Sequence, residues 1–354
     1  MLTGMMVLTN TSGMAGDYGS SRVIVPAPMD ARFAHLAWPK VIKADDGTLI
    51  VAYDAGRVHA NGEGCPAVSL SGDGGKTFTP PKILMTFDKA TPYLHSGNLA
   101  IGKAEDGAIV LMAMAHTYDE RNSIFGWRSG DSGKTWRQVD TDKLGDSKTG
   151  SVFGHVFSVP GRGLAVCGHF RKPKGAGIWI AYSADQGKTW GDPRIITAND
   201  YVEPAFIYAG GRLIGLVREN SACAYHQYVS EDLGDTWQFQ PKAIQGNSAA
   251  VHTSPFLLAD PVQPCTFYAL QSERAGDKKI NRIFLWRAQG DSLPWQRLGL
   301  VASCPGVEDF SYPWMCQLKG REWFLVFYAG LVNGPSSIYG MTMTIPAIQA
   351  RSGA

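Results

Sequence analysis

Residues 71–78 read Ser71-Gly-Asp73-Gly-Gly75-Lys-Thr-Phe78, and this pattern returns three times along the chain. The later copies are Ser129-Gly-Asp131-Ser-Gly133-Lys-Thr-Trp136, Ser183-Ala-Asp185-Gln-Gly187-Lys-Thr-Trp190 and Ser230-Glu-Asp232-Leu-Gly234-Asp-Thr-Trp237. Each copy suits a tight turn, because the Asp carboxylate accepts backbone N–H groups, the Gly adopts positive φ and the aromatic ring packs over the turn. Their first residues are 58, 54 and 47 positions apart (129 − 71, 183 − 129, 230 − 183). A period of roughly fifty residues is typical of stacked supersecondary units.

A second repeat interleaves with these turns. Short apolar runs follow a glycine turn at Gly47–Tyr53, Gly107–Met112, Gly163–Cys167, Gly211–Val217 and Gly320–Tyr328, and Asp260–Leu270 fills the wide interval before the last run. Evenly spaced short strands with turn signals indicate an all-β protein. We therefore predict a six-bladed β-propeller of four-stranded antiparallel blades.

A ring of blades is closed when strands from the two ends of the chain pair with each other. Arg22–Pro26 and Ile338–Thr344 are strand-like, and we expect them to share the last blade. The predicted organisation is an N-terminal extension (1–21), a single propeller domain (22–346) and a C-terminal tail (347–354).

Composition narrows the class of protein. The chain has 354 residues, 44% of them hydrophobic, with 41 glycines and a net charge of +2, so neither nucleic acid nor membrane is an expected partner. The six cysteines lack the close pairs of a zinc knuckle or disulfide framework, and we read them as reduced thiols. Without a leader-like or membrane-spanning apolar segment, we expect a cytoplasmic protein, or a secreted one if a leader has been removed. The sequence does not indicate the oligomeric state.

Strand order predicts which residues meet. In each blade the start of the first strand and the end of the second share one rim, whereas the repeated turns occupy the other rim. Asp73, Asp131, Asp185 and Asp232 are therefore predicted to be structural. The substrate rim should carry Trp38, His95, His116, His155, His169, His252 and Tyr328, with His59 just beyond it. Titratable groups gathered at a propeller mouth indicate a polar binding site.

The repeated turn resembles the Asp box of the sialidase superfamily. Glu203-Pro204, fifteen residues before Arg218 (218 − 203), resembles the Glu and Arg pair of that family. Arg282 resembles a further pocket arginine, and Ser311-Tyr312-Pro313 resembles the strand that carries the nucleophilic tyrosine. Arg57 resembles a pocket-lining arginine. The resemblance implies an exo-acting glycoside hydrolase that acts on an acidic or related sugar and needs no cofactor.

The implied chemistry follows from charge. An anionic nucleophile is repelled by a substrate carboxylate, and a neutral tyrosine avoids that repulsion. An ordinary tyrosine ionises near pH 10, so Glu203 would take the Tyr312 proton. Arg218 and Arg282 would bind the substrate carboxylate.

The chain departs from the family pattern twice. Ala37-Trp38-Pro39 replaces the first pocket arginine, and simple strand alternation places Lys40 on the wrong face to substitute for it. The loop of the family's acid/base Asp reads Arg57-Val-His59-Ala-Asn-Gly-Glu63, which offers His59 or Glu63.

Two other functions stay open. A polysaccharide lyase or atypical glycosidase would use the same histidines, Tyr312 and arginines. A non-catalytic carbohydrate-binding propeller would explain the missing arginine and Asp. A metal site formed by His95, His116, His155 and His169 is not favoured, because these residues lack close ligand spacing.

Overall fold

The computed structural model describes residues 20–60, 62–87, 91–117, 122–144, 150–170, 176–219, 223–248, 250–275, 281–290 and 292–345. These residues form 25 β-strands and no helix. In this part of the chain, accordingly, no helix is long and apolar enough to cross a membrane. The all-β prediction is confirmed. Most of the predicted N-terminal extension and all of the predicted tail lie outside the described residues.

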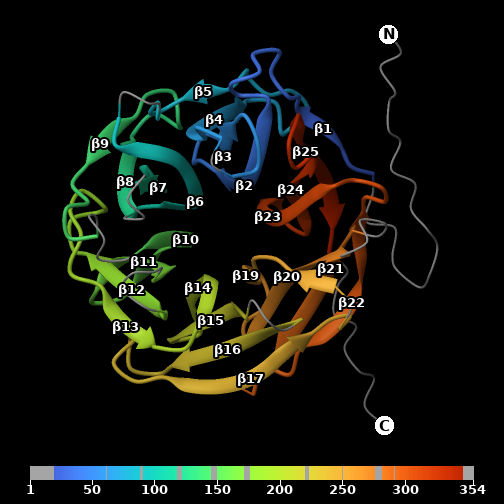
Figure 1. Ribbon diagram of the computed structural model, residues 1–354. Helices are drawn as coiled ribbons and strands as arrows, with labels where there is room; N and C mark the ends of the chain where they lie inside the picture. The colour runs from blue at the N-terminus through green and yellow to red at the C-terminus, as the bar shows by residue number, and fades with distance from the viewer. Residues whose placement is uncertain are drawn as a thin grey trace.

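The strands follow one another in six antiparallel groups, which Figure 1 shows around a ring. The first three groups are β2 (His35–Lys43), β3 (Leu49–Gly56), β4 (Cys65–Ser71), β5 (Lys82–Ile83); β6 (Tyr93–Lys103), β7 (Ile109–Thr117), β8 (Asn122–Ser129), β9 (Arg137–Val139); and β10 (Ser151–Val159), β11 (Gly163–His169), β12 (Ile178–Ser183), β13 (Arg194–Thr197).

The other three groups complete the ring in Figure 1. They are β14 (Tyr201–Ala209), β15 (Arg212–Glu219), β16 (Ala224–Ser230), β17 (Gln238–Gln245); β18 (Ala250–His252) with β19 (Phe256–Ala259), β20 (Thr266–Ala275), β21 (Asn281–Gln289), β22 (Gln296–Ser303); and β23 (Asp309–Lys319), β24 (Glu322–Gly330), β25 (Ser336–Thr344), β1 (Arg22–Val25).

Hydrogen bonds between groups join some of them into larger sheets. β6 and β10 pair in parallel, and β2 meets β25 at His35 and Ser336, so the strands form two eight-stranded sheets, one of four strands and one of five. β1 pairs antiparallel with β25, as the sequence predicted for the closing strands. The strands nearest the middle of the ring are β2, β6, β10, β14, β19 and β23 (Figure 1).

The Asp boxes connect the third and fourth strands of their groups. In the first, Asp73 accepts hydrogen bonds from the Thr77 N–H (2.9 Å) and hydroxyl (2.6 Å), and Ser71 accepts from the Gly75 N–H (2.9 Å). The same bonds recur at Asp131, Asp185 and Asp232. Register places Ser71 opposite Leu49 at the start of β3, far from the end of that strand. The boxes therefore lie at the opposite ends of the strands from Asp54, which pairs with Ala37.

Each Asp box also packs on the preceding group. A side chain at Gly133 would meet Ile50 and Leu70, and one at Gly187 would meet Val110. Tyr182 donates to the Leu233 carbonyl across the next boundary (2.9 Å). These turns therefore stabilise the seams between groups, which fits the structural role predicted for them.

Candidate functional site

The inner strands share a bulge that aims three side chains inward. In β2, β14 and β23, two residues face one residue on the neighbouring strand, at Trp38-Pro39, Glu203-Pro204 and Tyr312-Pro313. Trp38, Glu203 and Tyr312 have φ values of 54°, 53° and 54°. Proline suits the second bulge position because the disrupted ladder needs no N–H there. Positive φ in a bulky residue stores backbone strain, and such strain is often found at functional sites.

Tyr312 and Glu203 meet although they are 109 residues apart in the sequence. The Tyr312 hydroxyl donates to Glu203 Oε1, and Arg218 Nη1 donates to Glu203 Oε2 at 2.7 Å. Glu203 and Tyr312 are buried. The Glu203 carboxylate therefore bridges a phenol and a guanidinium.

Local charge sets the protonation of this pair. Burial alone would raise the pKa of Glu203, but the Arg218 charge and the hydrogen bonds from Tyr312 and Arg218 outweigh it and hold that pKa below its usual value. Burial and the Glu203 charge raise the pKa of Tyr312. The resting pair is therefore a neutral phenol that is hydrogen-bonded to an ionised carboxylate.

Arg274 is a second guanidinium of the site, and sequence reasoning missed it. Its Nη2 donates to the Phe310 carbonyl (2.9 Å) and to the Tyr328 hydroxyl (3.0 Å), and lies 3.2 Å from Asp309 Oδ1. Its charge acts on Tyr312 and on Arg218. Arg274 is the penultimate residue of β20, as Arg218 is of β15, so the repeat itself could have identified it.

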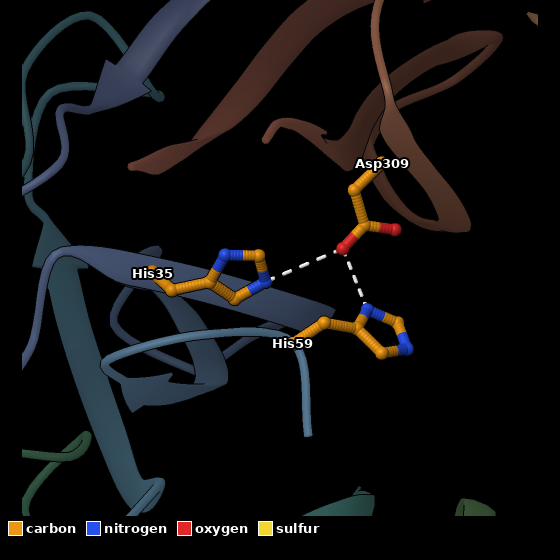
Figure 2. Close-up of side chains that lie close together, drawn as sticks. All are labelled: His35, His59 and Asp309. Atoms are coloured by element: carbon orange, nitrogen blue, oxygen red, sulfur yellow. Dashed lines mark hydrogen bonds and ion pairs between the residues drawn. The ribbon is translucent and has the colours of Figure 1, made fainter. Parts of the chain in front are cut away.

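Asp309 joins two histidines to this group (Figure 2). His59 Nδ1 lies 2.6 Å from Asp309 Oδ2, and His35 Nε2 lies 3.3 Å from the same oxygen. Tyr328 donates to the other oxygen at 2.7 Å. Although burial raises the pKa of Asp309, these hydrogen bonds and the nearby positive charges lower it well below its usual value. Asp309 and His35 were not predicted, because both precede the strand positions inferred from the sequence.

His59 lies beside the inward-facing side chains. Its ring is 5.3 Å from that of Trp38, edge to face, and Trp38 is 6.3 Å from Tyr312. The His59 side chain is 28% exposed, whereas Asp309 and His35 are each 1% exposed. With Nδ1 directed at the carboxylate, His59 has its Nε2 turned away from Asp309 (Figure 2).

The predicted orientation of Lys40 was wrong. Simple alternation placed it out of phase with Ala37, but the bulge at Trp38-Pro39 inserts one residue and restores the phase. Ala37 pairs with Asp54 and Lys40 pairs with Ala52, so both face the same side. Lys40 is completely buried.

The remaining predicted arginines lie elsewhere. Arg282 lies on β21 and pairs with Glu273 (3.0 Å), which precedes Arg274 on the neighbouring strand β20. Arg57 pairs with Glu63 (3.1 Å) in the loop that contains His59, and the Arg57 side chain is 60% exposed. The structure thus brings together Tyr312, Glu203, Arg218, Trp38 and His59, and pairs Arg282 with another carboxylate.

The predicted ring of histidines divides into several roles. His169 Nδ1 accepts a hydrogen bond from the Glu203 N–H (3.2 Å) and so helps to fix the backbone of Glu203. His95 and His116 lie ring to ring at 5.1 Å. His252 is buried near Gln271 and against Tyr225. His155 bonds to the Leu257 carbonyl (2.9 Å), and burial lowers its pKa to about 4.

Among the described residues, one group of side chains has a geometry that could bind a metal ion. His35, His59 and Asp309 place one donor atom each within 4.8 Å of one another. The Asp309 carboxylate already faces Arg274 and accepts from Tyr328, so its charge has partners without an ion.

Known proteins share this architecture. A family model described as a BNR repeat-like domain matches residues 47–322. No curated protein matches the chain. A protein of unknown function from Dyadobacter fermentans is 17% identical, with a TM-score of 0.72 over 93% of this chain and 99% of its own.

Sialidase structures are similar in fold. A Hadza microbial sialidase is 19% identical with a TM-score of 0.70 over 92% of this chain and 68% of its own. The Trypanosoma rangeli sialidase is 16% identical with a TM-score of 0.69 over 95% of this chain and 59% of its own. At these identities the likeness establishes the fold alone.

Proposed function

This chain belongs to the BNR repeat-like domain family of the sialidase superfamily, and from that premise we propose that it is an exo-acting glycoside hydrolase for an acidic sugar. The observation that carries the proposal is the hydrogen bond from Tyr312 to a Glu203 carboxylate that Arg218 holds from its other side. A buried phenol on a buried carboxylate is the pairing that a tyrosine nucleophile needs.

The proposal includes the fold. The six antiparallel groups are the blades of a propeller, with β2, β6, β10, β14, β18 with β19, and β23 as the innermost strands. The ring in Figure 1 and the pairing of β1 with β25 support this description.

The reaction proceeds in two balanced steps. Glu203 takes the Tyr312 proton, the phenolate oxygen bonds to the anomeric carbon, and the bond to the leaving oxygen breaks as that oxygen gains a proton. Water then attacks the same carbon and loses a proton, and the departing Tyr312 oxygen recovers its proton from Glu203. Two displacements retain the anomeric configuration.

His59 donates a proton to the leaving oxygen in the first step and takes one from the attacking water in the second. Its Nδ1 faces Asp309, which fixes the tautomer and orientation of the ring and leaves Nε2 for the substrate. His59 stands in the loop where the family resemblance implied an Asp, and Asp309 reaches it from β23. Glu63, the other sequence candidate, is paired with Arg57.

The substrate is a sugar that carries a carboxylate. Arg218 and Arg274 both act on Tyr312 electrostatically, and the Arg218 Nε is buried without a partner in the described protein. A carboxylate placed between two guanidiniums forms charge-assisted hydrogen bonds. Because Tyr312 is neutral until Glu203 takes its proton, it does not repel the substrate carboxylate when the sugar binds.

Substitution of Tyr312 by Phe tests the proposal. With aryl glycosides of acidic sugars, Tyr312→Phe should lose ~10³-fold or more of the turnover while it retains sugar binding. Tyr182→Phe, in which the lost hydroxyl bonds the Leu233 carbonyl at the other rim, is the matched control and should keep full turnover.

The products separate the competing functions. Hydrolysis releases the free sugar, whereas a lyase would generate an unsaturated product that absorbs in the ultraviolet. Full turnover by Tyr312→Phe, or binding without any turnover by the wild-type protein, would overturn the hydrolase proposal.

A further inference from the structure

Lys40 is a buried cation that the proposed reaction does not yet use. It lies on β2, 0% exposed, and its Nζ has no hydrogen-bond partner among the described residues. Burying an ammonium group without hydrogen bonds is costly, and a protein seldom retains one without a compensating interaction.

Aromatic rings surround the Lys40 ammonium group. Its Nζ lies 4.0 Å from the ring centre of Phe153, 4.3 Å from that of Trp314 and 5.7 Å from that of Tyr312. A cation over an aromatic face is attracted by the negative π-face of the ring. Phe153 belongs to β10, and the other two rings belong to β23. Lys40, on β2, therefore contacts side chains of two other inner strands.

The titratable groups that face Lys40 are Glu203 from β14, Tyr312 from β23 and His155 from β10. Burial lowers the pKa of Lys40 to about 7, and the charge of Glu203 opposes that decrease. His155, with its low pKa, is neutral near pH 7. Glu203 is therefore the charged group that faces Lys40.

We propose that Lys40 is a positioning residue that holds the Tyr312 ring and sets how the proton is shared between Tyr312 and Glu203. The inference rests on the proposed function. When Glu203 takes the proton, the negative charge moves from the carboxylate to the phenolate, whose π-face attracts a cation more strongly than a neutral phenol does. Lys40 thus places a positive charge near the face of the Tyr312 ring. It lies on β2, the strand where Ala37 replaces an arginine.

The first arm of the test needs no activity. The pKa of Lys40 is about 7 in the folded protein and 10.5 ordinarily. In the window between them the unfolded chain binds a proton that the folded chain lacks, so stability rises with pH. Chemical denaturation should show this rise in the wild-type protein and not in Lys40→Met. In Glu203→Gln the rise should start at lower pH, because the opposing carboxylate charge is gone.

The second arm measures turnover. In the wild-type protein, kcat/KM should fall as the pH rises through about 7 and Lys40 loses its proton. Lys40→Met should lower the maximum and displace this basic limb. Lys43→Met is the matched control, because Lys43 is on the same strand and its Nζ donates to the Leu318 carbonyl.

The outcomes are distinct. Denaturation and pH–rate profiles of Lys40→Met that keep the wild-type shape, or that match those of Lys43→Met, would overturn the role of Lys40. A wild-type protein without hydrolytic activity would overturn the proposed function and the catalytic meaning of Lys40, while the denaturation arm would still report its coupling to Glu203.

Discussion

Arg274 and Arg282 are two neighbouring arginines with different surroundings. Arg274 contacts the Tyr328 hydroxyl and the Phe310 carbonyl beside Tyr312, whereas Arg282 pairs with Glu273. A guanidinium that binds substrate in a fixed geometry is not replaced by an ammonium group. The structure therefore favours Arg274 over Arg282 as the partner of Arg218.

Substitution of each arginine by Lys tests this choice. Arg274→Lys should lower kcat/KM for a carboxylate-bearing sugar about thirtyfold, or ~2 kcal/mol, chiefly through KM. Arg282→Lys should leave kcat/KM nearly unchanged. Thermal melts of both variants control for folding. Equal losses, or a larger loss for Arg282→Lys, would contradict the assignment.

Trp38, Glu203 and Tyr312 show how the backbone serves the site at the residue scale. Each precedes a proline and has positive φ, a conformation that costs of order 1–3 kcal/mol in a residue other than glycine. The three side chains are the ones that the bulges direct inward. The strain therefore accompanies the geometry that places Tyr312 on Glu203.

At the element scale, the first turn of each group repeats a conformation. Gly47, Gly107, Gly163, Gly211 and Gly320 have positive φ there, between 55° and 87°. The fifth group has Cys265 at the same place, with a φ of 53° and an exposed side chain. The Cβ atom of a cysteine is sterically unfavourable in this conformation, and glycine has no Cβ atom.

Cys265→Gly should therefore stabilise the protein. The expected gain is about 1 kcal/mol in the free energy of unfolding, measured by chemical denaturation. Gly211→Cys is the reverse change at the equivalent turn and should destabilise by a similar amount. A loss of stability in Cys265→Gly would show that the repeat does not equate these two turns.

The Asp boxes predict how stability depends on pH. The hydrogen bonds of Thr135 to Asp131 lower the pKa of Asp131 from 3.8 to about 2, against a small opposing effect of burial. A carboxylate with a lowered folded pKa stabilises the protein fully above 3.8, and that contribution is lost as the pH falls to about 2. Asp131→Asn should thus be less stable than the wild-type protein near neutral pH, with the difference shrinking in acid.

Denaturation across this pH range measures the effect. Asp142→Asn, a change at an exposed carboxylate in the nearby turn, is the control and should follow the wild-type curve. A pH-independent difference between Asp131→Asn and the wild-type protein would contradict the electrostatic explanation.

At the scale of the whole molecule, the sequence predicted the architecture better than the site. Repeats revealed the strands and the turns between them, because each depends on a short local pattern, whereas Tyr312, Glu203 and Arg218 were singled out by the resemblance to sialidases. Lys40 was placed on the wrong face because a bulge changes the phase of β2. Asp309 was missed because it precedes the strand positions inferred from the sequence, and Arg274 was missed although it lies near the end of β20. Alternation alone does not reveal a bulge, although the recurring X-Pro pairs mark where these occur.

The ring brings distant segments to one place. Asp309 lies 250 residues from His59, and Tyr312 lies 109 residues from Glu203, yet each pair is hydrogen-bonded. The proposed function requires that this assembly makes Tyr312 a nucleophile.

Mass spectrometry after covalent trapping identifies the nucleophile. A fluorinated acidic sugar with an activated leaving group forms the glycosyl-enzyme quickly and releases it slowly, because fluorine destabilises the positively charged transition state. Peptide mapping should find one sugar per chain, on Tyr312, and none in Tyr312→Phe. An adduct on Glu203 or His59, or continued turnover with no adduct on Tyr312, would show that Tyr312 is not the nucleophile.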